Sequence, residues 1–413
     1  MKDRISTGTL GNGLTYGVRV TDLDTADVQL CLVLKTGSLQ QRNEENGLAH
    51  MVEHMNMSFD KYGYYKESLE YAGYGVTDFD RTMYVLGCRN CRDSIQQCIA
   101  ILGQIAKGSY LRMEYLEEIK QDIVEEIHSR NLAGKSKAEQ EVFGHPFYQS
   151  RLPAGDAESV RNTNFARVTA FHKQWYTPDR MAVFVVGAVN PSDIEQGIAA
   201  ALSGLSCADQ SDYVPSELQS SGRYPSPQPG RITSVWLPAG NMNLLEIYIK
   251  YTDQPDLTLK SELVRNILAG QLDTVCGTGL RSVHCPVNFL AAMFINFINI
   301  QQFCKFRITY HSTALSTETI TGIIKNAIYS IVNDPELESI VEQYKKMYAA
   351  YYSSSQFYSS LDVHSLLEEC ADHFILGSPL LSYELGMEQI TDALNSIRYT
   401  EVRQAAELLL AEK

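Results

Sequence analysis

The sequence predicts an α+β protein built from two similar halves, each with a mainly antiparallel β-sheet covered by helices. Three observations indicate this fold class. Short β-rich runs are followed by helical patterns, this order starts again in the second half, and a segment rich in Pro and Ser separates the two. We therefore expect one domain at residues 1–205, a linker at 206–230 and a second domain at 231–413.

In the first half, runs rich in β-branched and aromatic residues predict strands, and longer runs of helix-forming residues predict helices. The expected strands lie at residues 11–20, 28–37, 83–88 and 181–189, and the expected helices at residues 45–57, 93–106, 113–132 and 164–175. Another helix is expected to open at Asn190 and Pro191, which are residues typical of a helix start.

The second half repeats this order after the Pro-rich linker. Strands are expected at residues 231–237, 244–252, 289–300 and 303–311, a helix at residues 259–272, and several helices from residue 317 to the end. Gly277 and Gly279 follow the expected helix and predict a turn.

The composition is that of a folded protein that does not bind nucleic acid. Of the 413 residues, 44% are hydrophobic and 20% are charged, which suffices for two substantial cores. The formal net charge of −14 opposes binding to a phosphate backbone, because such binding needs clustered Lys and Arg. We expect no nucleic-acid partner.

The cysteines and the N-terminal residues point to a reducing compartment. The nine cysteines are an odd number spread from Cys31 to Cys370, which is unlike a disulfide framework. No apolar run of signal-peptide or membrane-helix length is present. We expect a cytoplasmic protein that does not associate with membranes.

One motif carries metal chemistry. His50 and His54 stand at positions i and i+4, so a helix places both imidazoles on one face, where they can share a zinc ion. Glu53 lies on nearly the same face, and a carboxylate beside a metal-bound water can take its proton and later protonate a leaving amine. The pattern is the inverted HxxEH zinc motif. The alternative is a solvated helix face.

A catalytic zinc usually has three protein ligands, so a third must come from elsewhere. An acidic helix that follows offers several carboxylates, although such a run is also typical of a solvated face. The candidates are Glu117, Glu118, Asp122, Glu125 and Glu126.

Five segments together resemble the pitrilysin and mitochondrial-processing-peptidase family of zinc peptidases, in its short-subunit form. They are TLGNGLTYGV, KTGSLQQRNEENGLAHMVEHM, DIVEEIHSR, GHPFYQSRLPAGDAESV and FHKQWYTPDRMAVFVVGAVNP. The resemblance implies two homologous α+β domains, one zinc per chain and Glu126 as the third ligand. It also implies a chamber closed by two chains, in which peptides pair with an edge strand near the metal.

The sequence departs from the family pattern at three places. Ile119 stands where relatives often have a further glutamate, with Glu118 one position aside. The edge strand reads Tyr74-Gly75-Val76-Thr77 instead of Asn-Ala-x-Thr, so Tyr74, Gly75 and Val76 are the expected substrate-binding residues. Arg281 matches the Arg of a substrate-binding Arg/Tyr pair, but residues 287–289 contain no Tyr.

These observations predict a zinc-dependent endopeptidase for short or unfolded peptides, with leader-peptide processing as one form of that activity. Glu53 is the expected base. The missing Tyr suggests a related second subunit that supplies the Arg/Tyr pair, with a homodimer as the alternative. The competing hypothesis is a non-catalytic, peptide-binding or scaffold subunit. It is opposed by the complete set of His50, His54, Glu126 and Glu53, which such a subunit would not need.

Overall fold

The computed structural model divides the chain into two compact units. Unit 1 comprises Met1–Ala133, Pro146–Arg223 and Ser359–Gly386, and unit 2 comprises Gly134–His145, Tyr224–Tyr358 and Met387–Lys413. The structure describes residues 4–21, 27–58, 71–129, 142, 144–206, 224–225, 232–239, 242–253, 255–283, 287–297, 300–310, 316–354, 357, 361–380 and 383–410. Most of the predicted linker at 206–230 lies outside these residues.

Unit 1 is built on a six-stranded sheet in the order β1-β2-β6-β3-β5-β4. The strands are β1 Arg4–Thr9, β2 Thr15–Val20, β3 Asp27–Leu34, β4 Tyr71–Thr77, β5 Thr82–Arg89 and β6 Met181–Gly187. Only the pairing of β2 with β6 is parallel among the described strands. Because β4 lies at the end of this order, one of its edges has no strand partner among the described residues.

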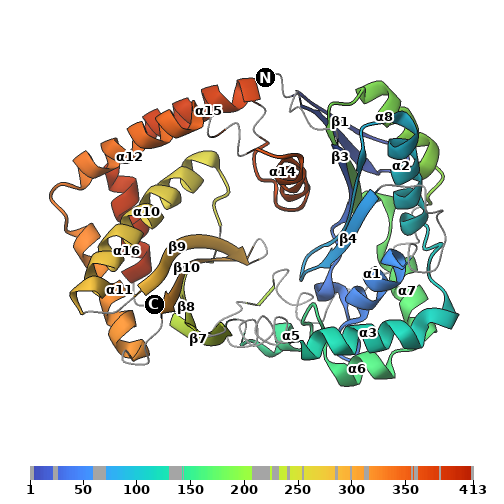
Figure 1. Ribbon diagram of the computed structural model, residues 1–413, viewed down its shortest axis with the longest axis horizontal. Helices are drawn as coiled ribbons and strands as arrows, with labels where there is room; N and C mark the ends of the chain where they lie inside the picture. The colour runs from blue at the N-terminus through green and yellow to red at the C-terminus, as the bar shows by residue number, and fades with distance from the viewer. Residues whose placement is uncertain are drawn as a thin grey trace. The chain divides into compact units, whose positions relative to one another are not determined.

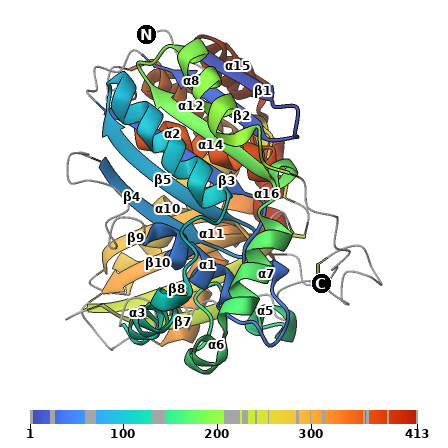
Figure 2. The same cartoon turned by 90° about the vertical axis from the view of Figure 1, so that its right-hand side faces the viewer.

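Helices cover one face of this sheet (Figures 1 and 2). They are α1 Leu48–Met57, α2 Arg92–Ala106, α3 Leu116–His128, α5 Pro146–Gln149, α6 Ala157–Asn162, α7 Phe165–Trp175 and α8 Pro191–Leu202, with 3₁₀ turns η1 Ser38–Gln40, η2 Met113–Tyr115 and η3 Pro178–Arg180. Leu30, Leu32 and Leu34 of β3 belong to the core under these helices. Cys31 and Val33 lie in a different core on the other face, as the two-residue period of a strand requires.

A helix from the last quarter of the chain covers the sheet face that carries Cys31 and Val33. Helix α14, Val363–Leu376, packs Leu367 and Cys370 against β3, β5 and β6. Two ion pairs fix the helix to the sheet, one from Arg19 to Glu369 and one from Arg81 to Asp372. Residues 359–386 therefore belong to unit 1, although the sequence placed them in the domain at 231–413.

Unit 2 contains a four-stranded antiparallel sheet in the order β7-β8-β10-β9. Its strands are β7 Ile232–Ala239, β8 Met242–Thr252, β9 Val287–Phe297 and β10 Gln301–Tyr310, and its helices are α10 Leu259–Ser282, α11 Thr317–Val332, α12 Leu337–Tyr352 and α16 Tyr399–Leu410. Helix α15, Tyr383–Ser396, contains the boundary between the units. Helices α10, α11 and α16 pack on one another, and α16 also contacts β8. The predicted α+β class with two helix-covered, mainly antiparallel sheets is confirmed.

The turn predicted at Gly277 and Gly279 was wrong. Gly277 and Gly279 do not form a turn but continue α10 to Ser282. A Cβ atom at Gly279 would lie 2.7 Å from Cγ2 of Ile323 on α11, so this glycine allows the two helices to approach closely. Glycine occurs both in turns and where helices pack closely, so the residue type alone does not distinguish the two.

No helix in the described part of the chain has the length and apolar character that a membrane span requires.

Candidate metal centre

Helix α1 carries the two histidines, and its N-terminus is held by the preceding loop. Gly47 begins the helix with φ of 90°, a left-handed conformation that glycine adopts without strain. The side-chain Oε1 of Gln41 accepts a hydrogen bond of 2.7 Å from the backbone N of Ala49. This bond satisfies one of the donors that a helix start leaves unpaired, and it fixes α1 in register one residue before His50.

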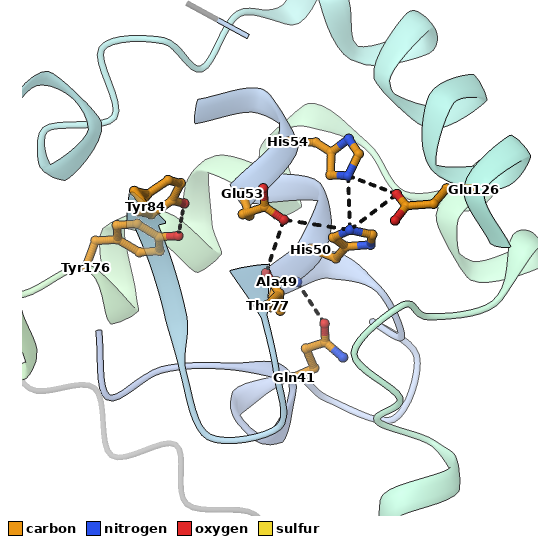
Figure 3. A network of polar contacts seen from close by, with 9 residues as sticks. All are labelled: Gln41, Ala49, His50, Glu53, His54, Thr77, Tyr84, Glu126 and Tyr176. Atoms are coloured by element: carbon orange, nitrogen blue, oxygen red, sulfur yellow. Dashed lines mark hydrogen bonds and ion pairs between the residues drawn. The ribbon is translucent and has the colours of Figure 1, made fainter. Parts of the chain in front are cut away.

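Three ligand atoms converge where α1 meets α3 (Figure 3). The Nε2 atoms of His50 and His54 are 3.0 Å apart. Oε2 of Glu126 lies 3.2 Å from Nε2 of His54 and 3.6 Å from Nε2 of His50. Ligand bonds of about 2.0–2.1 Å place the ligands of a tetrahedral zinc about 3.3–3.4 Å apart. The observed spacings bracket this value, so the three residues fit a zinc ion.

The charge around the histidines also favours a cation. Burial lowers the pKa of His54, but its hydrogen bond with Glu126 and the nearby carboxylates of Glu53 and Asp122 outweigh burial and raise the pKa. A site that stabilises positive charge on an imidazole also stabilises a metal ion in the same position.

Glu53 lies next to this set of ligands and is buried, with 5% of its surface exposed. Its Oε2 is 3.7 Å from Nε2 of His50, and Oγ1 of Thr77 donates to the same oxygen at 3.5 Å. Burial raises the pKa of Glu53 to about 7. His50, Glu53 and His54 have ligand atoms within 4.8 Å of one another, so Glu53 is also within reach of a metal ion. Glu126 is the better-placed third ligand because its Oε2 lies 3.2 Å from Nε2 of His54, near the spacing of two zinc ligands. Glu53 remains as a proton acceptor beside the metal position.

The edge strand β4 crosses directly over Glu53. A Cβ atom at Gly75 would lie only 1.9 Å from Oε1 of Glu53, so the strand reaches the carboxyl group only because residue 75 is glycine. Gly75 was predicted to bind substrate, and its contact with the base is a role that the sequence did not reveal.

Tyr74 and Val76 are each 41% exposed and lie on the opposite face of β4 from Gly75. The hydroxyl of Tyr74 is 3.3 Å from Nδ1 of His364, near the start of α14. Arg281 lies in unit 2, in the last turn of α10, where its Nη2 donates to Oγ1 of Thr278 at 3.2 Å. The predicted substrate contacts of all four residues remain predictions.

Arg151 supports the loop before α1, a role that its sequence context did not predict. It is 2% exposed, and its Nε donates to the backbone O of Gln41 at 2.9 Å. Its Nη1 donates to the backbone O of Phe147 at 3.1 Å, and the guanidinium lies 4.2 Å from the ring of that residue. Arg151 thus fixes the loop that carries Gln41, which in turn fixes α1. The only available signal was its place in the segment GHPFYQSR, which shows no chemistry by itself.

Two family models match the chain. One is described as Insulinase (Peptidase family M16) and matches residues 18–147, and the other is described as Peptidase M16 inactive domain and matches residues 162–272. The four residues of the metal centre, His50, Glu53, His54 and Glu126, all fall within the first match.

Curated relatives are similar to parts of the chain. The probable zinc protease PqqL of Haemophilus influenzae is 29% identical over 210 residues, which are 46% of this chain and 22% of that protein. PqqL of Escherichia coli is 24% identical over 319 residues, 71% of this chain and 34% of that protein. The chloroplastic stromal processing peptidase of Pisum sativum is 21% identical over 206 residues, 47% of this chain and 16% of that protein. The chain thus spans about a third or less of these relatives.

Solved structures share the whole fold. The periplasmic protease PqqL from Escherichia coli matches 99% of this chain with 47% of its own, at a TM-score of 0.77 and 17% identity. A protease from Helicobacter pylori matches 98% of this chain with 96% of its own, at a TM-score of 0.70 and 16% identity. These likenesses show that both units have the fold of known proteases.

We predict that the purified chain binds about one zinc ion and that His50→Ala and Glu126→Gln each weaken this binding more than tenfold, because each removes one of three ligands. Metal analysis after dialysis against a zinc buffer measures the effect. His128→Ala is the control, since His128 lies on the same helix as Glu126 but its Nδ1 is engaged 2.6 Å from the backbone O of Val124. Unchanged zinc content in His50→Ala and Glu126→Gln would refute the ligand assignment.

Proposed function

The chain belongs to peptidase family M16, the insulinase family, and from this premise we propose that it is a zinc-dependent endopeptidase. The observation that carries the proposal is the buried Glu53 beside three side chains, His50, His54 and Glu126, whose spacing fits a zinc ion. A structural zinc site is closed by four protein ligands, whereas a catalytic site has three and a neighbouring base.

Each residue of the centre has a defined part in peptide hydrolysis. A zinc ion held by His50, His54 and Glu126 would polarise the substrate carbonyl and make water a stronger acid. Oε2 of Glu53 would take the proton from the attacking water and deliver it to the leaving amine nitrogen. The buried surroundings of Glu53 favour its uncharged form, so the carboxyl group can hold that proton until the amine accepts it.

The edge of β4 is the proposed docking place for the substrate backbone. An unpaired strand edge offers backbone donors and acceptors to an extended peptide, and the contact of Gly75 with Glu53 would bring a peptide paired there close to the base. Side chains of such a peptide that point to the α14 face of the sheet would meet Tyr74, Val76 and His364. Cleavage of unfolded or short peptides, including leader peptides, fits this mode because a folded protein rarely offers a free extended segment.

Two further features of the proposal concern partners and location. Phe289 on β9 and the two preceding residues provide no Tyr to accompany Arg281, so we propose that a related subunit supplies the Arg/Tyr pair, with a homodimer as the alternative. A cytoplasmic location is retained as part of the proposal, because no disulfide bond joins the seven cysteines in the described part of the chain.

The second candidate function is a non-catalytic subunit that binds peptides. The incomplete Arg/Tyr pair favours it, as does the match of residues 162–272 to a domain described as inactive. Under this alternative, neutralising Glu53 would have no effect on whatever activity a complex shows.

We predict that Glu53→Gln retains zinc but lowers turnover of an unfolded peptide by roughly 10²–10⁴-fold, because an amide cannot accept the water's proton. Cleavage of a quenched fluorescent peptide, together with zinc content, separates the two effects. Glu125→Gln is the matched control, because Glu125 is adjacent to a ligand but directs its Oε1 to the side chain of Gln121 at 2.9 Å. Equal turnover by Glu53→Gln and the unmodified chain would rule out the proposed mechanism.

We predict that Gly75→Ala also retains zinc while losing at least tenfold in turnover. The added methyl group would overlap Oε1 of Glu53, and the pairing of β4 with β5 opposes movement of the strand, so the carboxyl group is displaced. Gly322→Ala is the control because a Cβ atom at that position on α11 meets no atom within 4 Å. A fully active Gly75→Ala variant would show that the position of Glu53 is not critical.

We predict that the isolated chain binds zinc but cleaves poorly, and that a related subunit with an intact Arg/Tyr pair restores cleavage. The missing contacts would stabilise the developing oxyanion, and the loss of one such donor costs roughly 3–4 kcal/mol. Activity is measured before and after mixing, with changes to the partner's Arg or Tyr as the control. Rapid peptide cleavage by the isolated chain would disprove the requirement for that subunit.

A further inference from the structure

Unit 2 contains a cavity of its own, far in sequence from the zinc ligands. It has a volume of about 230 Å³ and lies between the first turns of α10, the face of α16 from Glu401 to Leu408, and the end of β8. Polar and charged side chains line one part, including Asp256, Lys260, Arg265 and Glu401, while Val264, Ala405 and Leu408 provide apolar walls.

Arg265 is the unusual member of this lining. The residue is 6% exposed, and burial lowers the pKa of its guanidinium. Among the described residues it makes one hydrogen bond, from Nη1 to the backbone O of Asp256 at 2.8 Å, and no carboxylate forms an ion pair with it. The nearby groups Tyr251, Glu262 and Asp256 raise the pKa of the guanidinium, but by less than burial lowers it, so the positive charge is only partly compensated. Arg265 lines the cavity, and its other N–H groups make no hydrogen bond with a described residue, so an anionic ligand in the cavity would find donors there.

The carboxylates of Asp256 and Glu401 already interact with donors of the protein itself. Asp256 accepts from the backbone N of Thr258 at 2.9 Å and from Oγ of Ser261 at 2.5 Å. Glu401 pairs with Nζ of Lys260 at 2.7 Å and also accepts from the backbone N of Arg398 at 2.9 Å. Burial raises the pKa of both carboxyl groups, but these donors, and for Asp256 also the nearby charge of Arg265, lower it by more, so both stay ionised.

From this arrangement we propose that the cavity binds a small monoanionic carboxylate through Arg265, with a compact apolar group of the ligand against Val264 and Ala405. The planar guanidinium matches a carboxylate with two parallel hydrogen bonds. A dianion such as phosphate is disfavoured because Asp256 and Glu401 lie in the same cavity. This chemistry is that of a free C-terminal amino-acid residue, and the residues that line the cavity all belong to unit 2, whereas His50, His54 and Glu126 belong to unit 1.

Calorimetric titration of the full chain with N-acetyl-leucine, N-acetyl-leucinamide and inorganic phosphate tests the charge requirement. N-acetyl-leucine should bind at least tenfold more tightly than the amide, which differs only in lacking the carboxylate, and more tightly than phosphate. Failure of N-acetyl-leucine to bind, or equal binding of the amide, overturns the proposal. Tighter binding of phosphate overturns the monoanion assignment.

Two variants test whether Arg265 and the cavity bind the ligand. Arg265→Gln should weaken N-acetyl-leucine binding at least tenfold, while Lys325→Gln, which removes a positive charge from an exposed position on α11, should leave it unchanged. If Arg265→Gln does not fold, Gln404→Trp decides, because this exposed residue lines the cavity and a bulky ring there fills it without touching the core. Unchanged binding in either folded variant contradicts the assigned site.

Discussion

The packing of one ten-residue helix against its neighbours is the constraint on which the metal centre depends. The spacing of His50 and His54 brings two imidazoles together on α1. The position of Glu126 and the orientation of the Glu53 side chain depend instead on contacts with α3 and β4. Metal ligands must meet within a few tenths of an ångström, so the loop and strand that hold α1 matter as much as the motif. Arg151 and Gln41 form that support from one side, and Thr77 and Gly75 limit Glu53 from the other.

This arrangement explains why Glu53, the proposed base, is buried although burial opposes its charge. A carboxylate in water is a weak base near neutral pH, whereas desolvation raises the pKa of Glu53 to about 7, close to the value at which a group both accepts and returns a proton efficiently. Strand β4 helps to exclude water from Oε1 of Glu53, and only a glycine at position 75 leaves room for that oxygen. The choice of residue at position 75 is thus coupled to the chemistry of residue 53.

The sequence was sufficient for elements that carry their own periodic or spacing signal. The strands at 181–189 and 244–252 and the helices around His50 and residues 164–175 were found close to β6, β8, α1 and α7. Features that arise only from contacts between distant segments could not be predicted. The support of Gln41 by Arg151 joins residues 110 positions apart, and Gly279 allows close helix packing where its identity alone suggested a turn. The cavity around Arg265 is formed by three elements that no local pattern connects.

Helix α14 shows that the two halves of the sequence are not independent folding units. Val33, Val85 and Val186 lie on the sheet face that α14 covers, and residues 1–205 alone would leave this apolar face in water. The ion pairs of Arg19 and Arg81 with α14 would be lost as well, and Arg19 is 2% exposed, so its charge would lose a buried partner. The predicted boundary at residue 205 therefore separates patterns of strands and helices, whereas completion of the sheet that carries β4 and the base requires residues more than 150 positions later.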